Sequence, residues 1–189
     1  IDILVNAAGV NIKTRSMTAM TPEQWDQVMN INATGVYNCL HAVLPAMIER
    51  KDGLIINISS ISGLRPSIRT SAYGAAKAAV IHYTGSQAAM LARKGVRVNN
   101  IAPGWIVPHQ ADEVGQGSFW NRFGFETMGR PEEMQSALEG GSLYNMSSLP
   151  IPRLGRPEDM AWLAMFLASD RSNYITGQLI SVSGGVYMP

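Results

Sequence analysis

A tyrosine followed four residues later by a lysine, with a serine thirteen residues upstream, is the arrangement in this chain that could transfer a proton. These residues are Tyr73, Lys77 and Ser60. The segment SAYGAAKAAVIHYTGS has many small residues and no proline, which predicts a helix with Tyr73 and Lys77 on one face, a turn apart. A phenol with a pKa of about 10 is a poor base near neutrality, but a neighbouring ammonium lowers that pKa. We therefore expect the pair to exchange a proton with a substrate oxygen that the Ser60 hydroxyl, at a strand end, holds in place.

The tyrosine and lysine alone are not specific, because many helices carry a solvated lysine beside a half-buried tyrosine. Further segments narrow the interpretation: DILVNAAG (2–9), NINATG (30–35), ISS (58–60), YGAAK (73–77), VNNIAPG (98–104) and YITGQLISVSGG (174–185). In this order they closely resemble the short-chain dehydrogenase/reductase family. The resemblance runs from the first residue almost to the last.

The resemblance implies four catalytic residues: Asn32, Ser60, Tyr73 and Lys77. Tyr73 would be the general acid in ketone reduction and the general base in alcohol oxidation. Lys77 would stabilise the phenolate and donate to the nicotinamide ribose, while Ser60 would bind the substrate carbonyl. Asn32 would support a water that leads from Lys77 to solvent. The structural alternative for Asn32 is a residue that breaks or caps a helix, since asparagine competes for backbone hydrogen bonds.

The resemblance also implies NAD or NADP as cofactor. Besides Tyr73 and Lys77, the implied cofactor-binding residues are Asn6, Ala7, Ala8, Gly9, Pro103, Gly104 and Ile106. The family often has asparagine where Ala7 stands, so backbone contact is what remains there. The family commonly has threonine or serine where this chain has Pro108. Proline has no hydroxyl, so we do not expect a side chain to recognise the nicotinamide carboxamide at that point.

One family feature is missing from these residues, namely the glycine-rich turn between the first strand and helix that receives the cofactor pyrophosphate. Ile1 falls inside what resembles the family's fourth strand. We therefore expect an amino-terminally truncated chain. The strand end that distinguishes NAD from NADP is also missing, so the preference between them is unreadable.

The predicted fold class is α/β, a doubly wound, Rossmann-like parallel sheet. Four short apolar runs have the composition of strands buried on both faces, at 1–5, 54–58, 96–102 and 178–182. Longer helical patterns separate them, which implies right-handed crossovers and parallel strands. At 189 residues, with 46% hydrophobic content, the chain is long enough for one core, and we expect a single domain over 1–189.

Local signals place the helices. Thr21 begins a capping box with proline at the first helical position, and the helical pattern reaches about Arg50. Residues 30–35 could interrupt it, and Pro45 is expected to bend it. A second helix is expected from Pro157, where acidic residues follow at the positive end of the helix dipole.

The segment 105–150 is expected to be a substrate lid. It holds three of the four phenylalanines and two of the four tryptophans, among glycines and polar residues. Connections of this length are usually functional, and aromatic residues and methionines favour an apolar or bulky ketone or alcohol. A subunit contact is the alternative. Six acidic residues between 112 and 139 argue against docking an acidic carrier protein there.

Composition excludes several classes of partner. A formal charge of +1 without basic runs argues against nucleic acid, and no apolar run is long enough for a membrane span. Cys39 is the only cysteine, which favours a reducing, cytoplasmic compartment. His41 and His82 lack the spacing of metal ligands, so no metal is expected. By resemblance alone, we expect a homo-tetramer or homodimer.

Two hypotheses follow from these patterns. The first is an NAD(P)-dependent oxidoreductase that interconverts a secondary alcohol and a ketone, with Tyr73 as general acid and base. The second is a non-catalytic scaffold or relic subunit of the same fold that has lost dinucleotide binding.

Overall fold

The computed structural model describes residues 1–12, 14, 16–66, 71–109, 133 and 150–188. Most of the predicted lid at 105–150 lies outside these residues.

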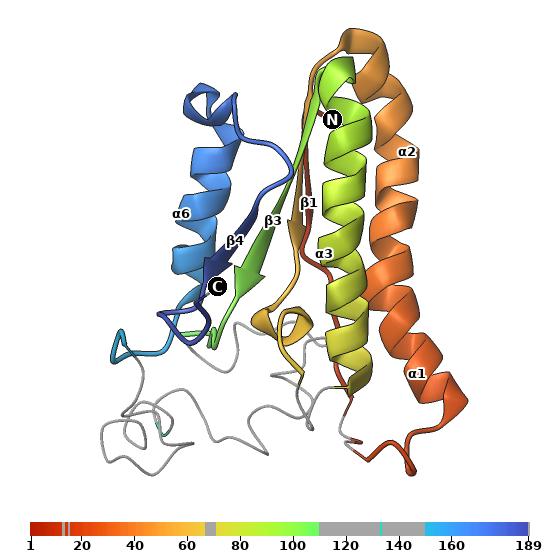
Figure 1. Cartoon of the computed structure of the whole chain (residues 1–189), viewed down its shortest axis with the longest axis vertical. Coiled ribbons are helices and arrows are strands. Elements are labelled where there is room, and N and C mark those ends of the chain that lie inside the picture. The colour runs from red at the N-terminus through yellow and green to blue at the C-terminus, as the bar shows by residue number, and fades with distance from the viewer. Residues whose placement is uncertain (13, 15, 67–70, 110–132, 134–149, 189) are drawn as a thin grey trace.

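A four-stranded parallel sheet forms the centre of the molecule (Figure 1). Its strands lie in the order β1 (Ile3–Asn6), β2 (Gly53–Ile58), β3 (Val96–Pro103) and β4 (Leu179–Val182). Each strand coincides with one of the predicted apolar runs. All three pairings are parallel, so the carboxyl ends of the strands share one edge of the sheet.

Helices cover both faces of this sheet, which confirms the predicted Rossmann-like fold class. In Figure 1, α2 (Gly35–Arg50) and α3 (Ser71–Leu91) lie on one side, and α6 (Pro157–Ala168) lies on the other. The strands point toward the end of the molecule where α3 begins. Residues at the carboxyl ends of the strands therefore lie near the first turns of α3.

The helical stretch before β2 has the predicted start and interruption. Thr21 caps α1 (Pro22–Met29) with a capping box, and its hydroxyl accepts from the backbone of Gln24. A π-helix, η1 (Asn30–Thr34), then separates α1 from α2. Such π-turns are frequent at functional sites.

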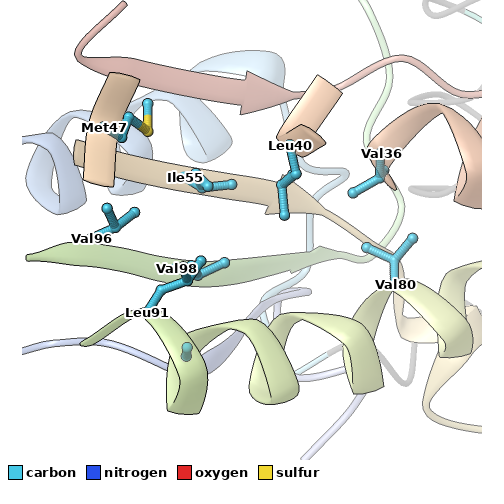
Figure 2. Packing of buried hydrophobic residues seen from close by; sticks show 9 residues of the cluster. Val36, Leu40, Met47, Ile55, Val80, Leu91, Val96 and Val98 are labelled. Carbon is cyan, nitrogen blue, oxygen red and sulfur yellow. The ribbon is translucent and has the colours of Figure 1, made fainter. Parts of the chain in front are cut away.

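Two apolar clusters hold the layers together. Between the sheet and the helices α2 and α3, the buried side chains interlock as Figure 2 shows, among them Leu40, Met47, Ile55, Val80, Leu91, Val96 and Val98. On the opposite face, Met160, Leu163, Ala164 and Leu167 of α6 pack against Leu54, Ile56 and Ile101. The strand residues therefore alternate between the two faces, as burial on both faces requires.

Candidate active site

The turn after β2 and the start of α3 bring Ser60 and Tyr73 together. Ser60 begins a short 3-10 turn, η2 (Ile61–Gly63), that lies directly against α3. A side chain at Gly63 would place its Cβ 2.7 Å from the backbone nitrogen of Ala78. Glycine therefore permits the close approach of this turn to the helix, and the approach positions Ser60 beside the first turn of α3.

The three residues singled out by spacing are adjacent. The Ser60 side chain is close enough to the hydroxyl of Tyr73 to lower its pKa. The Oγ of Ser60 accepts from the backbone nitrogen of Ser62 at 3.1 Å, which orients the side chain. The Nζ of Lys77 lies 5.6 Å from the centroid of the Tyr73 ring. The predicted one-turn separation on a common helix face is confirmed.

The protonation of Tyr73 differs from the sequence-based prediction. The half-buried phenol loses water around its hydroxyl, and this burial raises the pKa of Tyr73 above its ordinary value. The hydrogen bond from Ser60 lowers that pKa, but by less. The predicted lowering is therefore wrong for this structure, because sequence spacing reveals the neighbouring cation but not the loss of hydration.

Lys77 is a buried cation. Only 4% of it is exposed, and its ammonium donates to the backbone oxygen of Ile58, the last residue of β2, at 2.9 Å. Burial lowers the pKa of Lys77 from 10.5 to about 8. An ammonium has three protons, so donors remain beyond the one that Ile58 accepts.

Asn32 lies in the π-helix and is fully buried. Its amide donates to the backbone oxygens of Val10 and Val28, each at 2.8 Å, and its Oδ1 accepts from the nitrogen of Val10 at 3.3 Å. The side chain thereby ties the segment after β1 to the helical stretch. A Cβ on Gly9 would lie 2.9 Å from this Oδ1 and 3.4 Å from the Nζ of Lys77. Asn32, Gly9 and Lys77 therefore belong to one constellation.

The predicted cofactor-binding residues lie along the carboxyl edge of the sheet. Ala7, Ala8 and Gly9 are exposed directly after β1. Asn6 is buried, and its amide donates to the Oδ1 of Asn57 at 2.8 Å. The side chain of Asn6 is thus committed to the interior, and only its backbone is available at the edge.

The second predicted cofactor segment ends β3 and turns away from it. Pro103, Gly104 and Ile106 are partly exposed. Gly104 is pressed against the chain after β4, since a Cβ there would lie 2.7 Å from the Cα of Ser183. The nitrogen of Gly155 donates to the oxygen of Trp105 at 2.9 Å, which links this segment to the start of α6.

The backbone of residues 7–9 is exposed at the carboxyl ends of the parallel strands and includes Gly9. It lies beside Lys77, whose ammonium can donate further hydrogen bonds. A dinucleotide fits such an edge in an open α/β sheet. The nearby His109 points elsewhere, with its ring nitrogen 2.9 Å from the carboxylate of Glu158.

Sequence reasoning missed a set of polar side chains beneath the site: Asn57, Ser59, Thr84 and Asn100. Each is at most 2% exposed. The sequence did contain a signal, because asparagines interrupt two of the apolar runs near their carboxyl ends, 54–58 and 96–102, and Asn6 directly follows a third. Their alignment depends on strand register, which composition does not give.

Known proteins with similar sequences come from one family. Residues 1–117 match the family model described as short chain dehydrogenase, and residues 132–187 match one described as enoyl-(acyl carrier protein) reductase. A 3-oxoacyl-(acyl-carrier-protein) reductase from Thermotoga maritima is 36% identical over 98% of this chain and 66% of its own length. The chain thus spans about two thirds of the length of this curated relative.

Solved structures agree with this similarity. A 3-oxoacyl-(acyl-carrier protein) reductase from Brucella melitensis with bound NAD has a TM-score of 0.78 and 31% identity, covering 100% of this chain and 63% of that one. The protein ElxO with NADP bound has a TM-score of 0.75 and 31% identity, covering 97% of this chain and 66% of that one.

Proposed function

The chain belongs to the short-chain dehydrogenase/reductase family, and from that premise we propose that it is an NAD(P)-dependent oxidoreductase that interconverts a secondary alcohol and a ketone. The observation that carries the proposal is the convergence of Ser60, Tyr73 and Lys77: the Lys77 ammonium lies 5.6 Å from the centroid of the phenol ring, and the Ser60 side chain is close enough to lower the pKa of Tyr73. This arrangement offers a hydroxyl to hold a carbonyl oxygen and an acid to protonate it.

The protonation state of Tyr73 favours carbonyl reduction near neutral pH. Because burial raises the pKa of Tyr73, its phenol keeps its proton, as a general acid must. Ser60 holds the carbonyl oxygen, and Tyr73 gives that oxygen its proton as the carbonyl carbon is reduced. The nicotinamide, when bound, supplies the hydride. The phenolate left behind is stabilised by the Ser60 hydrogen bond and the Lys77 charge, and a proton from Lys77 restores it.

The proposed cofactor is NAD or NADP. Lys77 would bind its ribose, and the backbone of 7–9 and the Pro103–Ile106 segment would lie along it. The structure lends support through Gly9, since any larger residue there would crowd Asn32 and Lys77. Asn6 would contribute through its backbone alone, because its amide is bonded to Asn57.

The proposed substrate is an apolar or bulky ketone, with 105–150 as the lid over it. Because the relatives from Thermotoga maritima and Brucella melitensis are 3-oxoacyl-(acyl-carrier-protein) reductases, 3-oxoacyl thioesters are the first compounds to test. The acidic residues of the lid segment disfavour docking of an acidic carrier protein. We therefore expect an uncharged thioester of N-acetylcysteamine to be reduced at least as fast as the same acyl group on a carrier protein.

A homo-oligomer is proposed as well, built on the outer faces of α2 and α3. Apart from the buried Lys77, α3 has no lysine, arginine or acidic residue in 21 positions, which is typical of a helix covered on all sides. An apolar groove separates it from α2, lined in part by Tyr37, Ala79 and Tyr83. Sedimentation of Ala79→Arg tests this surface. We expect a smaller assembly than the wild type, and an unchanged mass would refute the proposed contact.

The central experiment compares Tyr73→Phe with the wild type in the full-length protein. We expect kcat for ketone reduction to fall roughly 100-fold or more, while NADH or NADPH still binds. Tyr174→Phe is the matched control, because Tyr174 is 99% exposed and distant in sequence from the site. Undiminished turnover in Tyr73→Phe would refute the assignment. Failure of the wild type to bind either cofactor would support the scaffold hypothesis instead.

A further inference from the structure

Three asparagines form a row across the sheet, just below the candidate active site. Strand register pairs Asn6 with Asn57 and Asn57 with Asn100. Asn6 donates to Asn57 at 2.8 Å, as described above, and Asn57 donates to the hydroxyl of Thr84 in α3 at 3.0 Å. Asn100 donates to the same hydroxyl at 3.2 Å. The row therefore converges on a single side chain of α3.

The hydroxyl of Thr84 is saturated by this arrangement. It accepts from two amides and donates to the backbone oxygen of Val80 at 2.8 Å, which uses its one proton and both lone pairs. The Oδ1 of Asn100 in turn accepts from the hydroxyl of Ser59. Thr84 is 1% exposed, and Asn57 and Asn100 are fully buried.

Packing alone does not require polar residues at these positions. Two residues earlier on the same sheet face, the strands carry Leu4, Ile55 and Val98, which pack in the core between the sheet and the helices. Buried amides cost free energy unless each finds a partner. The change from apolar to amide side chains occurs where β2 reaches the residues of the active site.

Four consecutive residues of β2 and its following turn are bonded toward α3. Asn57 donates to Thr84, and the backbone oxygen of Ile58 accepts from Lys77. Ser59 reaches Thr84 through Asn100. Ser60 bonds Tyr73. Because Thr84, Lys77 and Tyr73 belong to one helix, the bonds to Thr84 fix the end of β2 relative to the two chemical groups.

We propose that Thr84, Asn57 and Asn100 are positioning residues for the reaction, holding the Ser59–Ser60 strand end at a fixed distance from Tyr73 and Lys77. The inference rests on the proposed function for its catalytic consequence. The neighbouring Asn99 has no part in this arrangement, because its side chain bonds Ile175 and Gln178 instead.

The test measures Tyr73 directly, without turnover. The full-length protein is labelled with 3,5-difluorotyrosine, whose phenol is a stronger acid than that of tyrosine, and titrated by fluorine NMR. The signal of residue 73 is assigned by its loss in Tyr73→Phe. Lys77, the charged group beside Tyr73, is unchanged in every variant compared.

Thr84→Val removes the hydroxyl and keeps the shape of the side chain. We expect the pKa of residue 73 to rise by roughly one unit, because the Ser60 hydrogen bond to the phenolate weakens. We also expect kcat to fall about tenfold with KM nearly unchanged. Thr84→Ser keeps the hydroxyl and should restore both values. Asn100→Ala removes one of the two amides that donate to Thr84, and it should raise the pKa of residue 73 by a smaller amount.

Ser172→Ala is the matched control, since Ser172 is equally buried and its hydroxyl bonds two backbone oxygens near the end of α6. It should leave the pKa of residue 73 unchanged. The inference is overturned if the pKa of residue 73 in Thr84→Val and Asn100→Ala equals that of the wild type. It is also overturned if Ser172→Ala raises this pKa as much as Thr84→Val does. A wild type that reduces no ketone would refute the proposed function alone, since the titration still tests positioning.

Discussion

Replacement of Lys77 by methionine should stabilise the protein at neutral pH while removing its activity. Lys77 is 4% exposed, and the loss of hydration on burial is what lowers its pKa. Burial lowers its pKa from 10.5 to about 8, so the folded protein holds an ammonium that would be more stable in water. Methionine has a similar length and no charge, so Lys77→Met removes this cost without leaving a large cavity.

The magnitude follows from the two pKa values. A fall from 10.5 to about 8 corresponds to about 3 kcal/mol of disfavour for the charged form. Loss of the donor to Ile58 leaves a buried backbone oxygen without that partner, which costs about 1 to 2 kcal/mol. At pH 7 the variant should therefore be more stable than the wild type by about 1 to 2 kcal/mol.

The sign of the stability difference between Lys77→Met and the wild type changes with pH. Between pH 8 and pH 10.5, the unfolded wild type binds more protons than the folded form, so its free energy of unfolding rises with pH in this window. The variant lacks this titration. Its advantage should shrink as pH rises from 8 and reverse before pH 10.5, a total change of about 3 kcal/mol.

Urea unfolding of both proteins at several pH values between 7 and 10.5 measures this difference. Lys94→Met is the matched control, because Lys94 is exposed in the short 3-10 turn η3 (Ala92–Lys94), and its difference from the wild type should stay flat. A flat difference for Lys77→Met would refute the reasoning, since it would mean that folding imposes no cost on the ammonium. Loss of activity accompanied by higher stability would distinguish a functional lysine from a structural one.

Three further predictions test how the site is supported. Gly63→Ala should lower kcat and destabilise the protein by about 1 to 3 kcal/mol, because its Cβ meets the α3 backbone at 2.7 Å. Gly85→Ala, the control within α3, has nothing within 4 Å and should stabilise by about 0.5 to 1 kcal/mol, so equal thermal shifts in both would contradict the first prediction. Arg153 and the backbone N–H of Arg156, the residue that caps α6, lower the pKa of Asp159 from 3.8 to about 2. The stability that Asp159 contributes should therefore be present above pH 3.8 and fall as pH drops through 2, and an Asp159→Asn variant with the wild-type acid transition would contradict this prediction. Thr21→Ala should cost about 1 kcal/mol in urea unfolding, and no change would mean that the capping box contributes nothing.

The sequence was sufficient for the elements and for the spacing within one helix. Strands buried on both faces are continuous apolar runs, so their positions and their parallel direction followed from composition and from the helices between them. Tyr73 and Lys77 share a helix, and their separation is therefore a local property. Ser60 could be expected nearby only because it ends a strand, and Gly63 is what allows its turn to approach α3 closely.

The pKa of Tyr73 and the direction of the Asn6 side chain could not be predicted from the sequence, because both depend on contacts between distant segments. The direction of the Tyr73 pKa depends on competition between a neighbouring cation and lost hydration, and hydration is set by elements far apart in the chain. Similarly, Asn6 lies in a segment that predicts a cofactor edge, yet strand register places its amide against Asn57. An asparagine at a strand end can face solvent or the core, and only the register of three strands decides between them.

The same strand register explains why buried polar and charged side chains, which lower stability, lie together at one end of the molecule. Apolar side chains of β2 and β3 fill the core on both faces, as Ile55 and Val98 do, and this burial stabilises the sheet. Beyond them, the buried ammonium of Lys77 and the amides of Asn57 and Asn100 occupy positions where apolar residues would be more stable. Such residues are retained where a structure needs defined hydrogen-bond geometry more than added stability. Substitution of this end by apolar residues should therefore raise stability and reduce activity together, whereas substitution of the core should reduce stability first.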